Sequence, residues 1–236
     1  MEAYTIFAKV YDEFMKDIPY EEWLRIVDER IGKASGGSKV LELACGSGTF
    51  SGLLADKGYE VMGIDISEDM LKQAYGKKIP MTRFVNADMT EFSLSEQFDA
   101  AVCVCDGMNY LTCKKDLNDT LRCVSEHLKP GGIFIFDLKK EQYFKELSDS
   151  TFSDEIDGCR YVWENYYDEE TRDNVYSVTF FIRKIGSLYR KYEEQHLQHV
   201  FLREEVSEAL EECGYTLKEV IDENEREFYV LERTRA

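Results

Sequence analysis

The chain has 236 residues, which is enough for one domain with a substantial core, or for one domain that carries a sizeable insertion. Its 47 acidic and 29 basic residues give a formal charge of −18, and such a surface disfavours broad electrostatic binding to nucleic acid or to anionic membranes. No apolar run approaches the roughly 20 residues that span a bilayer, so we expect no membrane segment.

The N-terminus and the cysteines indicate the compartment. The stretch MEAYTIFAKVYDEF carries acids where a secretory signal peptide would carry bases. Seven cysteines, an odd number without a CxxC pair, are typical of free thiols in a reducing cytoplasm. Cys103 and Cys105 alternate along one predicted strand without a nearby histidine, so we expect no metal site.

The chain opens with two amphipathic segments. Aromatic residues at helical spacing run from Tyr4 to Phe14 and include Tyr11. A second apolar stripe, from Trp23 to Ile31, follows a proline. Both patterns predict helices that precede the first strand.

From residue 38 to residue 138, apolar strands alternate with helices. The pattern predicts strands at 38–44, 59–65, 83–87, 98–105 and 133–138, and helices at 51–58, 67–78 and 114–129. Ser67 is the expected N-cap of the second of these helices, and the run Pro130-Gly131-Gly132 is expected to stop the third. Strands that are apolar throughout and alternate with helices indicate an α/β fold, whose parallel sheet is covered on both faces.

After residue 150 the pattern changes to antiparallel structure. Segments 159–167, 174–184 and 187–201 are rich in Tyr, Phe and Val, and they predict two or three hairpins. A helix near 206–213 and a terminal hairpin from 215–221 and 226–232 follow. We therefore expect residues 1–150 and 201–236 to form one α/β domain, with 151–200 as an inserted antiparallel β sheet.

Four basic residues flank the turn of one predicted hairpin. Arg183 and Lys184 precede the turn Ile185-Gly186-Ser187, and Arg190 and Lys191 follow it. Protective charges on an exposed hairpin are the favoured interpretation. This hairpin is also the one local argument for a nucleic-acid ligand, which the overall charge makes unlikely.

The stretch LELACGSGTF, residues 41–50, leaves the first strand as a glycine turn. Gly46 and Gly48 permit a sharp turn and a close approach of a ligand to the backbone. A dinucleotide fingerprint would need a third glycine where Ser51 stands, and a P-loop would need a lysine. Glu42 would also place negative charge beside phosphate oxygens. The acid is better suited to a cation.

This stretch resembles the first motif of the class I S-adenosylmethionine (SAM)-dependent methyltransferases, an acid followed by x-Gly-x-Gly-x-Gly. The motif corresponds to Glu42, Ala44, Gly46 and Gly48, with Ala44 in place of the first glycine. The resemblance implies a Rossmann-like, seven-stranded, mostly parallel sheet with a C-terminal antiparallel hairpin, and SAM as cofactor. It implies that the acid anchors the methionine amino end.

Two further acids match the same family. Asp65 ends the second strand 17 residues after Gly48, where the family holds the ribose hydroxyls, and Asp88 matches the adenine site, with Ile66 and Met89 on the ring faces. The stretch LKPGGIFIFDL resembles the family's fifth strand. The resemblance also places four more residues beside the cofactor, which are Tyr11, Cys45, Met70 and Cys105.

The loop CDGMNYL follows the fourth strand, beside the expected cofactor. Asp106, Asn109 and Tyr110 are candidates for contact with the substrate. A helix-entry loop with polar caps would explain the same residues. Tyr11 is a candidate for contact with the sulfonium through its ring, although plain packing also explains an aromatic stripe.

The stretch YEEQHLQHVF predicts a strand with one polar face. Glu194, His196 and Gln198 share that face, which suits a wet cavity better than a core. The inserted sheet resembles the lids of small-molecule methyltransferases, so His196 is a candidate general base, with Glu194 and Gln198 at the substrate. The alternative is an edge strand that faces solvent.

The sequence therefore predicts SAM-dependent methyl transfer, by in-line displacement, to a nitrogen or oxygen nucleophile of a small polar acceptor. A protein or RNA acceptor is the alternative within the class. Outside it, the alternatives are an NAD-dependent oxidoreductase and a SAM-binding partner protein without catalysis. The oligomeric state stays open.

Overall fold

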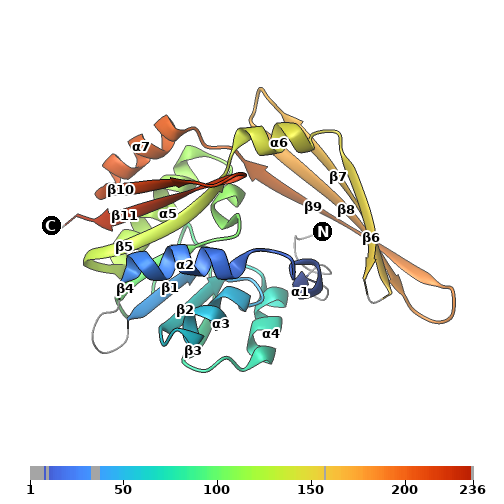
Figure 1. Cartoon of the computed structure of the whole chain (residues 1–236), viewed down its shortest axis with the longest axis horizontal. Coiled ribbons are helices and arrows are strands. Elements are labelled where there is room, and N and C mark those ends of the chain that lie inside the picture. The colour runs from blue at the N-terminus through green and yellow to red at the C-terminus, as the bar shows by residue number, and fades with distance from the viewer. Residues whose placement is uncertain (1–7, 9–10, 33–37, 157, 235–236) are drawn as a thin grey trace.

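A computed structural model describes residues 8, 11–32, 38–156 and 158–234 (Figure 1). Its main element is a seven-stranded sheet in the order β10-β11-β5-β4-β1-β2-β3. The strands are β1 (Lys39–Leu43), β2 (Glu60–Asp65), β3 (Thr82–Asn86), β4 (Phe98–Cys103), β5 (Leu128–Lys139), β10 (Tyr215–Asp222) and β11 (Arg226–Arg233). Strands β1 to β5 pair in parallel, and the β10–β11 hairpin pairs antiparallel with β5. The predicted Rossmann-like fold is confirmed.

Helices cover both faces of this sheet. They are α2 (Tyr20–Ile31), α3 (Thr49–Asp56), α4 (Glu68–Lys77), α5 (Lys114–His127) and α7 (Arg203–Glu212). Helices α2 and α3 pack on one face against Val40 and Val102, and α5 and α7 pack on the other against Leu41 and Phe134. Successive strand residues point to opposite faces, so the continuous apolar strands fill two core layers.

Two ends of predicted elements differ in the structure. Helix α5 ends at His127, and the run that begins with Pro130 lies inside β5 instead of preceding it. Strand register shifts there, between Phe98 and Ala100 on β4, because the run bulges out of the ladder. A side chain at Gly132 would meet the carbonyl oxygens of two other residues at 2.9 and 3.1 Å, so the bulge needs glycine.

The second sheet has four antiparallel strands in the order β6-β7-β8-β9 (Figure 1). They are β6 (Thr151–Ile156), β7 (Cys159–Asp168), β8 (Asp173–Arg183) and β9 (Tyr189–His199). We call this sheet the lid. Strand β6 and the short helix α6 (Glu141–Leu147) before it were not predicted, since β6 is a polar edge strand and α6 buries one residue, Phe144.

The N-terminal aromatic stripe is described in part. Tyr4 and Phe7 lie outside the described residues, and the helix α1 covers Tyr11–Phe14. Phe14 packs edge-on against Tyr161 of the lid, with ring centroids 4.5 Å apart. Helix α1 therefore joins the N-terminal segment to the lid.

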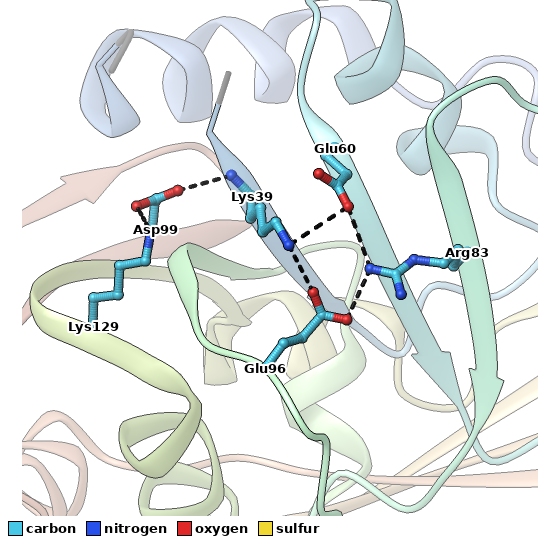
Figure 2. A network of polar contacts seen from close by, with 6 residues as sticks. All are labelled: Lys39, Glu60, Arg83, Glu96, Asp99 and Lys129. Carbon is cyan, nitrogen blue, oxygen red and sulfur yellow. Dashed lines mark hydrogen bonds and ion pairs between the residues drawn. The ribbon is translucent and has the colours of Figure 1, made fainter. Parts of the chain in front are cut away.

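Paired charges close the amino ends of the parallel strands (Figure 2). Glu96 contacts Lys39 at 3.0 Å and Arg83 at 2.8 Å, and Glu60 contacts the same two bases at 3.8 and 3.3 Å. Nearby, Lys129 pairs with Asp99 at 2.6 Å. Exposed pairs are each worth about 1 kcal/mol or less, but this network leaves no uncompensated charge among the six residues drawn.

Among the residues that the structure describes, no helix is both long and apolar enough to cross a bilayer. The cytoplasmic location stays a prediction, as does the division of the chain at residues 150 and 201.

Candidate functional site

A cavity of about 820 Å³ lies at the carboxyl ends of the parallel strands. Its floor comes from the residues that follow β1, β2, β3 and β4, and its lining includes three tyrosines, namely Tyr11, Tyr20 and Tyr110. Ligands of open parallel sheets bind at this end. Eleven of the predicted cofactor residues line the cavity: Tyr11, Glu42, Ala44, Cys45, Gly46, Asp65, Ile66, Met70, Asp88, Met89 and Cys105.

The turn after β1 is built from left-handed backbone. Ala44, Gly46 and Gly48 have φ angles of 50°, 56° and 76°. The left-handed region costs a residue with a Cβ roughly 1–2 kcal/mol, so Ala44 departs from the glycine motif at a cost in strain. Gly48 is not in the cavity lining, and a side chain there would lie 2.9 Å from the Phe84 ring on β3. Its role is the close packing of α3.

Glu42 lies almost entirely buried beneath this turn, with 3% of its surface exposed. Burial, reinforced by the nearby Asp65 carboxylate, raises the pKa of Glu42 to about 8. Its carboxyl group accepts a hydrogen bond from the hydroxyl of Ser51, the residue at the position of the missing third glycine. Ser51 therefore forms a hydrogen bond to the acid instead of providing a glycine. A cation bound beside Glu42 would lower its pKa and favour the ionised carboxylate.

Asp65 ties the turn after β1 to the start of α4. One carboxylate oxygen accepts the Gly46 N–H at 2.8 Å, and the other accepts the Ser67 N–H at 2.8 Å. Burial raises the pKa of Asp65, although the two N–H groups oppose this. Each carboxylate oxygen has a second lone pair. The residue can therefore accept from a vicinal diol in the cavity.

A third acid lies after β3. Asp88 accepts hydrogen bonds from the backbone N–H and the hydroxyl of Thr90, both at 2.8 Å and both on Oδ1. Ile66, also in the lining, exposes 70% of its surface, which is unusual for an aliphatic side chain beside a cavity. An acid with flanking apolar side chains suits a heteroaromatic base with an exocyclic amine.

Asp106 lies outside the cavity lining, in a buried ionic cluster. It pairs with Lys139 at 2.7 Å and with Arg226 at 2.9 Å, and Arg226 also binds Asp137. Burial opposes ionisation of Asp106, but the two bases outweigh it and hold its pKa below the ordinary value. The Arg226 guanidinium stacks on the Trp23 ring at 4.2 Å. These contacts give Asp106 a structural role.

Asn109 is also buried and outside the lining. Its Nδ2 donates to the His199 carbonyl oxygen on the lid at 2.9 Å, and its Oδ1 accepts the Lys139 N–H of β5 at 3.0 Å. The short 3₁₀ helix η2 (Gly107–Tyr110) thus carries an amide that joins the lid to the main sheet.

Tyr110 lines the cavity, and the three polar lid residues stand behind it. Glu194, His196 and Gln198 are 2–4% exposed, so the polar face of β9 is buried although β9 is an edge strand. None of the three is in the cavity lining. His196 reaches the cavity through Tyr110, whose hydroxyl lies 3.2 Å from Nδ1. Their roles in catalysis and substrate binding stay predictions.

Sequence reasoning missed several lining residues. Tyr20 begins α2 and has its hydroxyl 3.7 Å from the Cys105 sulfur, and Lys72 and Asp116 contribute charge from α4 and α5. Tyr20 directly follows Pro19, so its place at the start of the second predicted helix could have marked it as a candidate lining residue. Nothing in the local pattern of Lys72 or Asp116 marks them. Among the described residues, no cluster of His, Cys, Asp and Glu has metal-site geometry.

Comparison with known proteins finds methyltransferases. Residues 40–132 match a methyltransferase-domain family. A putative methyltransferase of Bacillus subtilis, YqeM, is 37% identical over 222 residues, which are 92% of this chain and 88% of that protein. A Streptomyces venezuelae dTDP-3-amino-3,4,6-trideoxy-α-D-glucopyranose N,N-dimethyltransferase is 27% identical, over 88% of this chain and 89% of that protein.

Solved structures agree. A SAM-dependent methyltransferase from Clostridium acetobutylicum superposes with a TM-score of 0.84 and 26% identity, over 99% of this chain and 100% of that chain. The carboxylates Glu42, Asp65 and Asp88 fit the cation, diol and base of SAM, and the alternative of an NAD-dependent oxidoreductase is set aside. By its motifs, its sheet order and its relatives, the chain belongs to the class I SAM-dependent methyltransferases.

Proposed function

We propose that the enzyme methylates a nitrogen or oxygen atom of a small polar acceptor, and that an amine nitrogen is the preferred nucleophile. The charge of the cavity lining carries this proposal. Among the described lining residues, Lys72 is the one base. It stands against five carboxylates, Asp65, Glu68, Asp69, Asp88 and Asp116, and against the Glu42 carboxyl group, whose pKa burial raises to about 8. Such a lining attracts amines and repels anions.

The residues of the cavity divide the work of binding. We expect Glu42 to face the ammonium end of SAM, Asp65 the ribose hydroxyls, and Asp88 the adenine amine. SAM supplies an activated methyl group, so the protein mainly aligns the acceptor, excludes water and removes a proton. Tyr11 and Tyr110 line the cavity from α1 and η2, where they can contact an acceptor.

The names of several relatives suggest an amino sugar as the methyl acceptor, but the diphosphate of their substrates does not suit this cavity. Three of them are named as dTDP-amino-sugar N,N-dimethyltransferases, and one of these acts on dTDP-3-amino-3,6-dideoxy-α-D-glucopyranose. The diphosphate of such a substrate would have to approach the carboxylates of this lining. We therefore expect an amine acceptor without a diphosphate.

A matched pair of acceptors tests this expectation. Purified enzyme with [methyl-³H]SAM would be offered the dTDP-linked 3-amino-3,6-dideoxyglucose and the same amino sugar without its dTDP group. We expect methylation of the free sugar with kcat/KM at least about 10-fold higher, which corresponds to about 1.4 kcal/mol of discrimination. A preference for the nucleotide sugar would contradict the charge argument.

The same assay addresses the alternatives. Methyl transfer to either amine excludes a partner protein without catalysis. Transfer to neither sugar, but to bulk RNA or to protein from a lysate, would favour the macromolecular alternative. The formal charge of −18 argues against RNA, since like charges repel along the phosphate backbone.

A further inference from the structure

The Tyr110 side chain stands between the cofactor cavity and the lid. It lines the cavity, and its hydroxyl oxygen lies 3.2 Å from Nδ1 of His196 on β9. The two rings meet edge-on, with centroids 6.2 Å apart and an interplanar angle of 75°. One side of the phenol therefore faces the ligand space, and its hydroxyl contacts a buried imidazole.

A carboxylate stands behind that imidazole. Oε2 of Glu194 lies 3.7 Å from Nε2 of His196, and the two side chains are 0% and 4% exposed. They are two residues apart on β9 and share its inner face. The separation is that of an ion pair, slightly longer than a hydrogen bond, and catalytic contacts of this kind commonly tighten when substrate binds.

We propose that Tyr110, His196 and Glu194 form a proton relay that leads from the acceptor into the lid. The inference rests on the proposed function, because it needs an amine or hydroxyl acceptor. The acceptor nitrogen forms its bond to the methyl carbon as the carbon–sulfur bond breaks with its electron pair on sulfur. The proton that nitrogen loses passes to the Tyr110 oxygen, while the Tyr110 proton passes to Nδ1 of His196.

The resulting imidazolium would be stabilised by Glu194. The proton returns through Tyr110 to solvent when the product leaves, which resets the relay. Tyr110 is the catalytic residue, since it faces the acceptor. His196 and Glu194 act through it and are positioning residues.

The charge of Lys139, which lies near the relay, is already paired. Tyr176 on β8 is the cross-strand partner of His196, and the Lys139 ammonium lies 5.7 Å from the Tyr176 ring centre. Lys139 itself pairs with Asp106 at 2.7 Å, and this ion pair weakens the electrostatic effect of Lys139 on the His196 ring. Glu194 lies at ion-pair distance from the His196 ring.

The relay is split between two parts of the fold. Tyr110 belongs to η2 on the main domain, and the other two members belong to the lid. The Asn109 amide holds the two together, one residue away from Tyr110. Proton removal therefore depends on a docked lid.

The tautomer of His196 tests the geometry without any acceptor. The chain has three histidines, so a ¹⁵N-histidine spectrum is simple, and His196→Asn assigns the relevant ring. The relay requires a neutral ring with its proton on Nε2, because Nδ1 must accept from Tyr110, and Tyr110→Phe should shift the Nδ1 resonance. A proton on Nδ1, or a ring that stays charged from about pH 6 to 9, overturns the proposal.

Kinetics with the free amino sugar test the chemistry. We expect kcat to fall about 100-fold in Tyr110→Phe and His196→Asn and about 10-fold in Glu194→Gln, with the acidic limb of the pH–kcat profile moved to lower pH in the last variant. Gln195→Ala, on the outer face of β9, is the matched control. An unchanged kcat and profile in Glu194→Gln would remove it from the relay.

S-adenosylhomocysteine affinity separates this failure from failure of the proposed function. The three relay variants should bind S-adenosylhomocysteine like the original chain, since none of the three contacts assigned to the cofactor is changed. If the original chain methylates neither sugar, the acceptor class is wrong. The histidine spectrum still decides whether the relay geometry exists.

Discussion

Glu42 is a carboxyl group that the fold keeps from ionising. It is buried beneath the glycine turn, and its pKa is raised to about 8 by burial and by Asp65. A cationic ligand that lies against it would lower this pKa, so binding near pH 7 should release a proton. Calorimetric titration with S-adenosylhomocysteine in two buffers of different ionisation enthalpy measures that release.

The matched variant is Glu42→Gln, which keeps the shape and can still contact Ser51. We expect it to release no proton on binding and to bind S-adenosylhomocysteine more weakly. Equal proton release by the variant and the original chain would place the titrating group elsewhere.

The same residue affects the stability of the free protein. A carboxyl pKa above its ordinary value of 4.5 means that the folded state binds the proton more tightly than the unfolded chain does. The free energy of unfolding therefore declines as pH rises from about 4.5 to about 8, by up to about 1.4 kcal/mol per pH unit. Glu42→Gln should flatten this decline in denaturant titrations, and an unchanged slope would contradict the burial argument.

At the residue scale, the sequence can predict the position of an acidic residue in the site when its expected partner is the cofactor or a residue close by in the sequence. Glu42, Asp65 and Asp88 follow strands at motif spacing, and all three line the cavity. Asp106 also follows a strand, but it pairs with Arg226, which is 120 positions away in the sequence. This pair gives Asp106 a structural contact outside the cavity lining. No local pattern could show that contact.

At the scale of elements, η2 is the joint between the main sheet and the lid. Asn109→Ala would leave the Lys139 N–H and the His199 carbonyl oxygen unpaired in a buried place. We expect a loss of about 2–4 kcal/mol of unfolding free energy and faster amide exchange in β9. The exposed Asn224→Ala serves as control, and equal stability of the two variants would mean that the lid docks without Asn109.

Helix α1 is fastened to the glycine turn by Asp12. Its carboxylate pairs with Lys77 at 2.7 Å and accepts from the Ser47 hydroxyl at 2.5 Å. Burial opposes ionisation, but Lys77 and the hydroxyls outweigh it and hold the pKa of Asp12 below 3.8. The contact is therefore intact above that pH and is lost as pH falls through the lowered pKa.

Because α1 carries Tyr11 to the cavity, Asp12→Asn should weaken S-adenosylhomocysteine binding by about 2- to 5-fold, the size of a partly exposed pair. Added salt should reproduce part of this loss in the original chain. Asp17→Asn, exposed in the same segment, is the control. Equal affinities of the two variants at low salt would show that α1 does not cover the ligand.

The elements of the main sheet could be predicted because apolar strands alternate with capped helices. Ser67 caps α4 as expected, with its side chain accepting the Met70 N–H. The lid was predicted less completely, since β6 reads as a polar loop and its pairing with β7 depends on a neighbour in space. The polar face of β9 is buried because the lid docks on the main domain, and the sequence of β9 alone cannot show that contact.

For the molecule as a whole, charge and topology act together. The network at the amino ends of the strands has three bases and three acids, so the net charge of −18 comes from the rest of the chain, including the cavity lining. This distribution favours a cationic methyl donor and an amine acceptor over phosphate-bearing ligands. That nucleic acid is not a ligand stays a prediction.

The central claim is that the cavity at the glycine turn binds SAM through its carboxylates. Calorimetric titration of the full chain with S-adenosylhomocysteine, with NAD as control and Asp65→Ala as the matched variant, tests it most directly. We expect micromolar binding of S-adenosylhomocysteine, no binding of NAD, and loss of binding in the variant, which removes the acceptor for the Gly46 N–H as well as for the ribose. Binding of NAD alone, or unchanged affinity in Asp65→Ala, would contradict this account.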